Sequence, residues 1–190
     1  HERHVGKARI AGDGQIRQMV ADAVKAVPGH RFTASFVLAE WLDVVDTWQI
    51  GSWEGYRDFK RLGRKTRLSE AQRALLWQIF EKVAAALTPQ GLVTRSALCT
   101  RLAAAIAAMK HPPYDHVVVD EAQDVDVSQL RLLAAMAGSK PNGLLFAGDL
   151  GQRIFQTPFS WKALGVDVRG RSRTLHVNYR TSHQIRAQAD

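Results

Sequence analysis

The stretch that decides the fold is His116-Val117-Val118-Val119-Asp120-Glu121-Ala122-Gln123-Asp124, in which an apolar run ends in two adjacent carboxylates. A second apolar run, Gly143-Leu144-Leu145-Phe146-Ala147-Gly148-Asp149, ends in a similar way later in the chain. Continuous runs of this kind are typical of buried parallel strands, and a parallel sheet presents the residues that follow its strands at one carboxyl edge, where ligands bind. We therefore predict strands over 116–120 and 143–148 whose ends meet at a single site.

The elements around these two strands predict the fold class. We expect a helix over 126–137, an irregular stretch over 149–172, a strand over 173–177 and a closing helix over 181–190. This alternation implies an α/β fold, a parallel sheet with crossover helices. Three strands are too few for such a sheet, so we expect the remaining strands in other parts of a longer protein. The phosphate loop Gly-x-x-x-x-Gly-Lys-Ser/Thr does not occur in this sequence, and we expect it upstream.

The segment 1–110 shows helical periodicity instead. We predict a first helix capped by Asp13, a second over 36–48, a short one near 53–62, and two more that begin at Ser69 and Thr94. Ser69-Glu70-Ala71-Gln72 has the pattern of a capping box.

The clearest boundary in the chain is His111-Pro112-Pro113-Tyr114, because two prolines stop a helix and the periodicity changes after them. We therefore predict an all-helical part over 1–110 and an α/β part over 111–190.

Composition limits the class of protein. A single cysteine, Cys99, excludes an internal disulfide and makes a reducing cytoplasm the default location. No apolar run approaches the ~20 residues of a membrane span, so we expect no membrane partner. The chain begins without Met, so we expect a processed product or an excised segment.

The net charge of +8 predicts a polyanionic partner. Six basic residues crowd one short segment: Arg57, Lys60, Arg61, Arg64, Lys65 and Arg67. A solvated surface is the alternative explanation for such a run. A second basic cluster at Arg169, Arg171 and Arg173 favours phosphate contact, and we take Arg61, Arg64 and Lys65 as candidate DNA-binding residues.

Polar residues follow each of the three predicted strands. Asp120 and Glu121 follow the first, and an acidic pair in this place is typical of the Walker B element, which handles Mg²⁺ and the attacking water in nucleotide hydrolysis. The alternative is a helix cap, which suits Asp124 or Asp126 but not the acidic pair. Gln152 follows the second strand, and Arg180 follows the third, where a guanidinium can stabilise charge on a transferring phosphoryl group.

Together these elements resemble motifs II, III and IV of the superfamily 1 helicases of the UvrD, PcrA and Rep type. Asp120-Glu121-Ala122-Gln123-Asp124 matches motif II letter for letter. Gly148-Asp149 with Gln152, Ile154 and Phe155 is similar to motif III, and Asn178-Tyr179-Arg180-Thr181 is similar to motif IV. Over 1–110 the resemblance rests on position only, because the family inserts a helical subdomain before motif II.

The resemblance implies a role for each matching residue. It implies that Asp120 holds Mg²⁺, Glu121 is the general base, Gln152 senses the γ-phosphate and couples it to DNA, Tyr179 packs against adenine and Arg180 is the arginine finger.

The resemblance also implies that aromatic residues after motif III stack on single-stranded bases. Phe155 and Trp161 match this pair, although Gln156-Thr157-Pro158-Phe159 intervenes where the family joins them directly. Phe159 is therefore an alternative to Trp161, and both are candidates for core residues instead.

The function implied is that of a segment of an ATP-dependent DNA helicase or translocase, with DNA repair as its setting and 3′ to 5′ polarity. Residues 1–110 would be the inserted helical subdomain (1B-like), and 111–190 the carboxyl-terminal part of the first RecA-like motor domain (1A-like). ATP, Mg²⁺, single-stranded DNA, single-strand/duplex junctions and the rest of the parent chain would be its partners. Alone, the segment is expected to hydrolyse ATP negligibly.

Two alternatives remain open from the sequence. One is a non-catalytic DNA-binding or protein-docking module derived from a helicase. The other is a Mg²⁺-dependent nuclease that uses Asp120, Glu121 and Asp149, which leaves Gln152 and Arg180 without a role.

Overall fold

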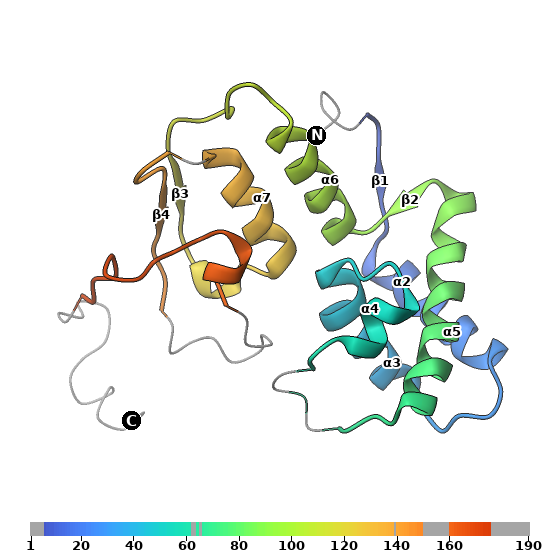
Figure 1. Cartoon of the computed structure of the whole chain (residues 1–190). Coiled ribbons are helices and arrows are strands. Elements are labelled where there is room, and N and C mark those ends of the chain that lie inside the picture. Colours follow the sequence, from blue (N-terminus) through green and yellow to red (C-terminus); the bar gives the residue numbers. More distant parts are fainter. Residues whose placement is uncertain (1–5, 62–63, 65, 139, 150–159, 176–190) are drawn as a thin grey trace, which may run out of the picture.

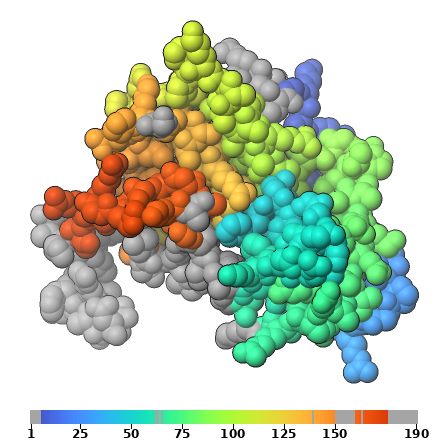
Figure 2. All heavy atoms as spheres, viewed as in Figure 1, coloured from blue at the N-terminus to red at the C-terminus, as the bar shows by residue number. Residues whose placement is uncertain are grey.

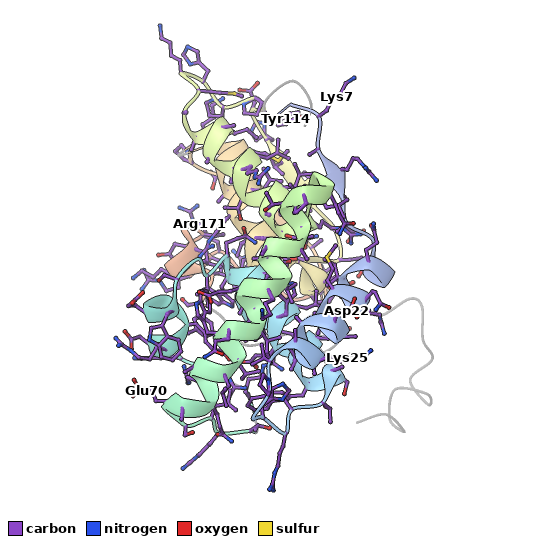
Figure 3. The ribbon with its side chains drawn as sticks, turned by 90° about the vertical axis from the view of Figure 1, so that its right-hand side faces the viewer. Lys7, Asp22, Lys25, Glu70, Tyr114 and Arg171 are labelled. Carbon is purple, nitrogen blue, oxygen red and sulfur yellow. The ribbon has the colours of Figure 1, made fainter. Side chains whose placement is uncertain are left out.

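The chain folds into two lobes with one helix, α6, between them (Figure 1). The structure is a computed structural model that describes residues 6–61, 64, 66–138, 140–149 and 160–175. Seen from the side, α5 and α6 extend from Glu70 near one end of the molecule toward Tyr114 near the other (Figure 3). None of the helices in these ranges is both long and apolar enough to cross a membrane.

The N-terminal lobe is mainly helical, as its periodicity predicts. Its elements are β1 (Arg9–Ile10), α2 (Asp13–Ala26), α3 (Ala34–Glu40), a π-helix (Trp41–Asp46), α4 (Trp53–Asp58), α5 (Glu70–Leu87), a 3-10 turn (Thr88–Gln90) and β2 (Leu92–Val93). The predicted second helix is therefore two segments of different winding, and the predicted short helix ends at Asp58.

Local hydrogen bonds explain where these helices begin. The Ser69 hydroxyl accepts a bond from Gln72 N at 3.3 Å and the Gln72 side chain accepts one from Ser69 N at 2.9 Å, which confirms the predicted capping box. The prediction that Asp13 caps α2 is wrong, because Gly12 is the cap residue. The Gln15 side chain accepts a bond from Gly12 N. Asp13 lies inside the first turn, where its negative charge interacts favourably with the positive end of the helix dipole.

A hydrophobic core joins the helices of this lobe. One face of α5 is fully buried in this core and packs against α2 and α4, through residues that include Leu76, Ile79, Phe80 and Val83. The ring of Tyr56 meets that of Phe80 edge to face at 5.3 Å between centroids.

A buried carboxylate lies at the edge of this core. Glu40 is 0% exposed, and it accepts bonds from Tyr56 Oη at 3.0 Å and from the Arg61 guanidinium at 2.6 and 2.8 Å. Burial, with the nearby Glu40 charge, raises the pKa of Tyr56. Arg64 Nη2 lies 3.6 Å from the same carboxylate and donates to Ala39 O at 2.8 Å. Two arginines of the basic run therefore serve to compensate a charge inside the lobe.

The two ends of the N-terminal lobe meet in a small parallel sheet that periodicity did not predict. Arg9 pairs with Leu92 and Ile10 with Val93, and Ala11 N donates to Val93 O at 2.9 Å. Strands of two residues are too short to produce a period. Their pairing brings the entry and exit of this lobe side by side (Figure 1).

The C-terminal lobe contains the predicted strands and their crossover helix. β3 (Val117–Val119) and β4 (Leu144–Phe146) are parallel neighbours, and α7 (Val127–Ala137) connects them. Both strands and the helix were predicted, although the strands are shorter than expected. α7 lies against one face of this pair, whereas Val118 and Leu145 are exposed.

The third strand, the closing helix and the division of the chain are the other predictions for this lobe. Residues 173–175, the described part of the predicted third strand, form no strand. A strand forms only where its backbone groups bond to a neighbouring strand. The rest of that segment and the closing helix 181–190 lie outside the described residues. α6 (Arg95–Ala107) packs closely against α7, although it belongs to the helical segment of the sequence. The division of the chain at residue 111 stays a prediction.

Contacts of polar and charged side chains tie the lobes together. Asp46 at the end of the π-helix accepts a bond from the hydroxyl of Thr94, the cap residue of α6, and burial raises the pKa of Asp46. The Arg131 guanidinium of α7 lies 5.7 Å from the centre of the Trp48 ring. In the space-filling view the atoms near residue 50 abut those of the C-terminal lobe (Figure 2).

The buried Glu40–Arg61 pair leads to a stability prediction. Arg61→Met leaves the Glu40 carboxylate buried with only the more distant Arg64 to compensate its charge, so we expect a loss of about 3 kcal/mol in urea unfolding. The matched control is Arg57→Met, four residues earlier, which breaks an exposed pair with Asp58 at 2.8 Å, against 2.6 Å for the buried pair. We expect no measurable change in the urea midpoint of that variant. Equal effects of the two substitutions would contradict the structural role of Arg61.

Candidate nucleotide site at the strand ends

Parallel pairing brings the ends of β3 and β4 together. The register pairs Val117 with Leu144 and Val119 with Phe146. Beyond the strands the contact continues, because Ala147 N donates to Val119 O at 2.8 Å and Ala122 N donates to Ala147 O at 2.9 Å. The segments Asp120–Glu121 and Gly148–Asp149 therefore leave the sheet side by side, as the sequence predicts.

Glu121 has a backbone conformation that few side-chain-bearing residues adopt. Its φ of 51° and ψ of 43° lie in the left-handed region, which costs of order 1–3 kcal/mol at a non-glycine residue. Two bonds hold the turn: Glu121 N donates to Asp120 Oδ1 at 2.9 Å, and Asp124 N donates to Glu121 O at 2.9 Å. The turn is held in one strained geometry, which is common where a side chain must be aimed at a ligand.

The acids that follow this turn divide by role. Asp126 caps α7, since its carboxylate accepts from Gln129 N at 2.8 Å and the Gln129 side chain accepts from Asp126 N at 2.9 Å. The cap alternative therefore accounts for Asp126. Asp120 and Glu121 are exposed and do not cap α7. Glu121 is the cap residue of the short 3-10 helix Ala122–Asp124, but its side chain makes no capping bond, so both carboxylates stand at the exposed strand ends.

One residue of this site received no separate role from the sequence. Gln123 is only 5% exposed; its side-chain oxygen accepts a bond from Asp149 N at 3.0 Å, and its amide nitrogen donates to Glu121 Oε2 at 2.6 Å. The sequence holds no signal for this role, because neither the burial of Gln123 nor its partner at Asp149 is a local feature, although a buried polar group needs partners.

Gly148 allows the two segments to approach this closely. A Cβ atom at Gly148 would lie 2.4 Å from Gln123 Oε1 and 2.8 Å from Ala122 N, both closer than van der Waals contact. The glycine is therefore required by the space between the segments and not by its backbone angles.

The carboxylates at the strand ends suit a hard cation that arrives with phosphate. Mg²⁺ is usually bound by one or two carboxylates together with substrate phosphates. Within the described ranges, no group of three or more His, Cys, Asp or Glu side chains is placed to hold a metal ion. The exposed Asp120 carboxylate fits the phosphate-assisted arrangement. A nuclease site built from Asp120, Glu121 and Asp149 would need these three carboxylates grouped closely enough to hold a metal ion, and the described residues show no such group.

Of the aromatic residues predicted to stack on DNA bases, only Trp161 lies within the described residues. Its ring meets Phe146 at 4.7 Å between centroids, almost perpendicular, and packs beside a small core of Val125, Leu130 and Val166. Much of the indole is therefore in contact with the protein, as in the core alternative, and base stacking by Trp161 stays a prediction. The predicted site residues of the later motifs lie outside the described residues: Gln152, Phe155, Phe159, Tyr179 and Arg180.

The basic residues predicted to contact DNA differ in their exposure to solvent. The Arg61 side chain is 5% exposed and that of Arg64 is 19% exposed, both against Glu40. Lys60 and Arg67 are exposed, and Lys65 lies outside the described residues. DNA contact by Arg61 would require its ion pair to open.

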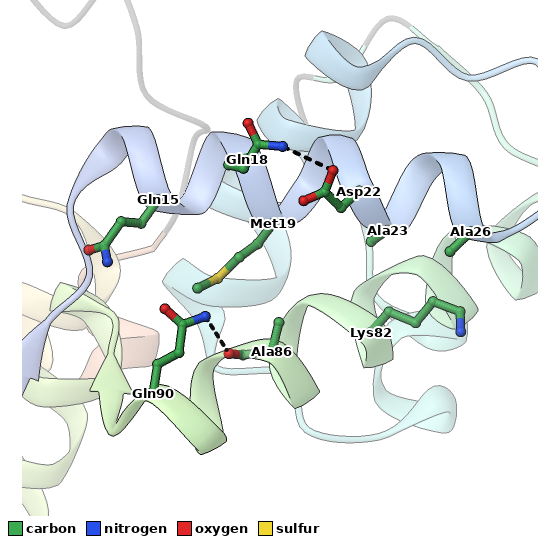
Figure 4. Close-up of a pocket in the computed structure, with 9 residues that line it drawn as sticks. All are labelled: Gln15, Gln18, Met19, Asp22, Ala23, Ala26, Lys82, Ala86 and Gln90. Atoms are coloured by element: carbon green, nitrogen blue, oxygen red, sulfur yellow. Dashed lines mark hydrogen bonds between the residues drawn. The ribbon is translucent and has the colours of Figure 1, made fainter.

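A hollow in the described surface lies away from these residues. It has a volume of about 450 Å³ between α2 and α5, and its walls include Met19, Asp22 and Lys82 (Figure 4). None of the predicted site residues lines it, so this hollow is separate from the strand ends.

The close approach at Gly148 leads to a second stability prediction. Gly148→Ala should force Gln123 and the neighbouring backbone apart and cost about 1–3 kcal/mol. Gly14→Ala is the control, because Gly14 lies in α2 with open space around it, and we expect a gain of about 0.5–1 kcal/mol. Thermal unfolding of both variants gives the comparison. An unchanged Gly148→Ala protein would contradict the packing at the strand ends.

No curated protein and no solved structure matches the chain. The profile of the UvrD/REP helicase N-terminal domain matches residues 54–160, which is more than half of the 190 residues and includes β3, α7 and β4 with both strand ends. The chain therefore belongs to the UvrD/REP helicase family.

Proposed function

We propose that this chain is part of an ATP-driven DNA helicase or translocase, and that the strand ends of β3 and β4 form part of its nucleotide site. The observation that carries the proposal is the parallel register of these strands, which sets Asp120 and Glu121 beside Gly148 and Asp149 in a chain of the UvrD/REP family. Phosphoryl transfer is catalysed mainly by positioning and charge, which rigid strand ends supply.

The roles of the residues follow from their place at the strand ends and from the motifs they match. Asp120 would hold Mg²⁺, which neutralises charge on the phosphates when it is bound. Glu121 would accept a proton from the water that attacks the γ-phosphate, while the bond to the ADP oxygen breaks. Gln152, Tyr179 and Arg180 keep the proposed roles of γ-phosphate sensor, adenine contact and arginine finger.

The DNA contacts belong to the same proposal. Aromatic residues after β4, namely Phe155 with Phe159 or Trp161, would stack on the bases of single-stranded DNA, and such stacking contributes ~1–3 kcal/mol per base without reading sequence. Basic residues would follow the phosphate backbone. Coupling this grip to the state of the nucleotide would move the protein along the strand, with 3′ to 5′ as the proposed polarity and the cytoplasm as the proposed location.

The catalytic part of the proposal is tested by DNA-stimulated ATP hydrolysis in the full-length protein that carries this chain. We expect Glu121→Gln to lower kcat by ~10²–10⁴ because the general base is lost. Arg180→Ala should lower it by ~10³–10⁵ because charge on the transferred group is no longer stabilised. The control is Glu54→Gln in α4, an exposed carboxylate far from the strand ends in the sequence, which should leave kcat unchanged.

The outcomes separate the candidate functions. Near-normal turnover in both Glu121→Gln and Arg180→Ala would defeat the role assignment. Binding of DNA without ATP hydrolysis by the wild-type protein would favour the non-catalytic module instead.

The DNA part is tested by fluorescence anisotropy with a single-stranded oligonucleotide. Because binding releases counterions, we expect log K to fall linearly with log salt, with a slope of ~0.7 per phosphate contact. Lys60→Gln combined with Arg67→Gln removes two exposed charges of the basic run and should flatten this slope. Lys82→Gln, beside the hollow between α2 and α5, is the control and should leave it unchanged. Absence of binding at low salt would count against both the motor and the module.

A further inference from the structure

A single buried side chain connects the two strand ends. Gln123 lies in the turn after β3, where its amide group has one bond to each side: Nε2 to the Glu121 carboxylate at 2.6 Å and Oε1 to the backbone N–H of Asp149 at 3.0 Å. Because the side chain is 5% exposed, little water can replace either partner. The bridge therefore has a defined geometry on both sides.

The chemistry of the partners fixes which way the amide faces. A backbone N–H can only donate and a carboxylate can only accept, so the oxygen of Gln123 must face Asp149 and its nitrogen must face Glu121. The reverse orientation would set two donors together on one side and two acceptors on the other. A glutamine satisfies both partners at once, whereas a glutamate or an apolar side chain cannot.

The surroundings prevent this amide from shifting. The Gly148 backbone lies so close to Gln123 Oε1 that a methyl group would not fit between them. On the other side, the strained backbone of Glu121 is held by its own bonds to Asp120 and Asp124. The position of Gln123 is therefore fixed by contacts with both Glu121 and the chain at Gly148 and Asp149.

We propose that Gln123 is a positioning residue that aims the Glu121 carboxylate and couples it to the segment after β4. This inference rests on the proposed function, in which Glu121 is the general base. Gln123 would touch neither nucleotide nor water and would act through Glu121.

Two substitutions separate the two halves of the bridge. Gln123→Glu keeps an oxygen for the Asp149 N–H but replaces the donor to Glu121 with a like charge. Gln123→Met has a similar length and removes both bonds. Gln129→Glu, six residues later, is the control, because a glutamate can still complete the capping box of α7.

The first readout is steady-state ATP hydrolysis by the full-length protein with DNA present. We expect Gln123→Glu and Gln123→Met to lower kcat ~10–100-fold, the effect typical of removing a group that orients a catalytic residue. The KM for ATP should stay within about twofold, because nucleotide contacts are not removed. Gln129→Glu should leave both constants unchanged.

The second readout needs no nucleotide. Amide hydrogen exchange of the 190-residue chain should show faster exchange at Asp149 in Gln123→Met, while Gln123→Glu and Gln129→Glu keep the wild-type rate. This pattern would support the bridge even if the wild-type protein hydrolyses no ATP, which is the result that would defeat the proposed function. Three results would overturn the inference: wild-type kcat in Gln123→Glu, an equal loss of kcat in Gln129→Glu, or unchanged Asp149 exchange in Gln123→Met.

Discussion

The pairing of β3 with β4 is the constraint on which the rest of the site depends. Each strand has three residues, yet their parallel register continues past the last strand residue through bonds at Ala122 and Ala147. Parallel strands need a crossover, and α7 supplies it from a cap at Asp126. The acidic pair and the Gly148 turn are neighbours only because this register holds, and the strained angles of Glu121 are tolerated because both flanking segments are anchored.

Burial decides what the charges of the N-terminal lobe do. In the sequence the basic run looks like one surface for a polyanion. In the structure it divides, because Glu40 is enclosed by the helices and draws Arg61 and Arg64 toward it, while Lys60 and Arg67 remain exposed. A charge removed from water needs an opposite charge more than a surface charge does, so the buried carboxylate forms ion pairs with the guanidinium groups of Arg61 and Arg64. Ion pairing with a buried carboxylate therefore accounts for Arg61 and Arg64, and DNA contact stays a prediction for the exposed residues of the run.

The site shows where prediction from sequence succeeds and where it stops. Asp120 and Glu121 were identifiable because an apolar run ends at them, and Asp126 as a cap because its spacing to Gln129 is local. Gln123 belongs to the segment that matches motif II, but its role was not visible in the sequence, because its partner Asp149 follows the next strand, β4. Trp161 was ambiguous for the same reason, since its contact with Phe146 is a tertiary one.

The sequence by itself determined the helices with local start signals, the two strands with their crossover helix, and the acids that follow the first strand. These features depend on periodicity, capping and chain-breaking residues, which act over a few positions. Only the tertiary structure decided that β1 pairs with β2, that α6 packs on α7, that Arg61 faces inward to Glu40, and that Gln123 joins the two strand ends. Each of these joins residues through space or depends on burial, and neither the distance between two side chains nor their exposure to water is encoded in local spacing.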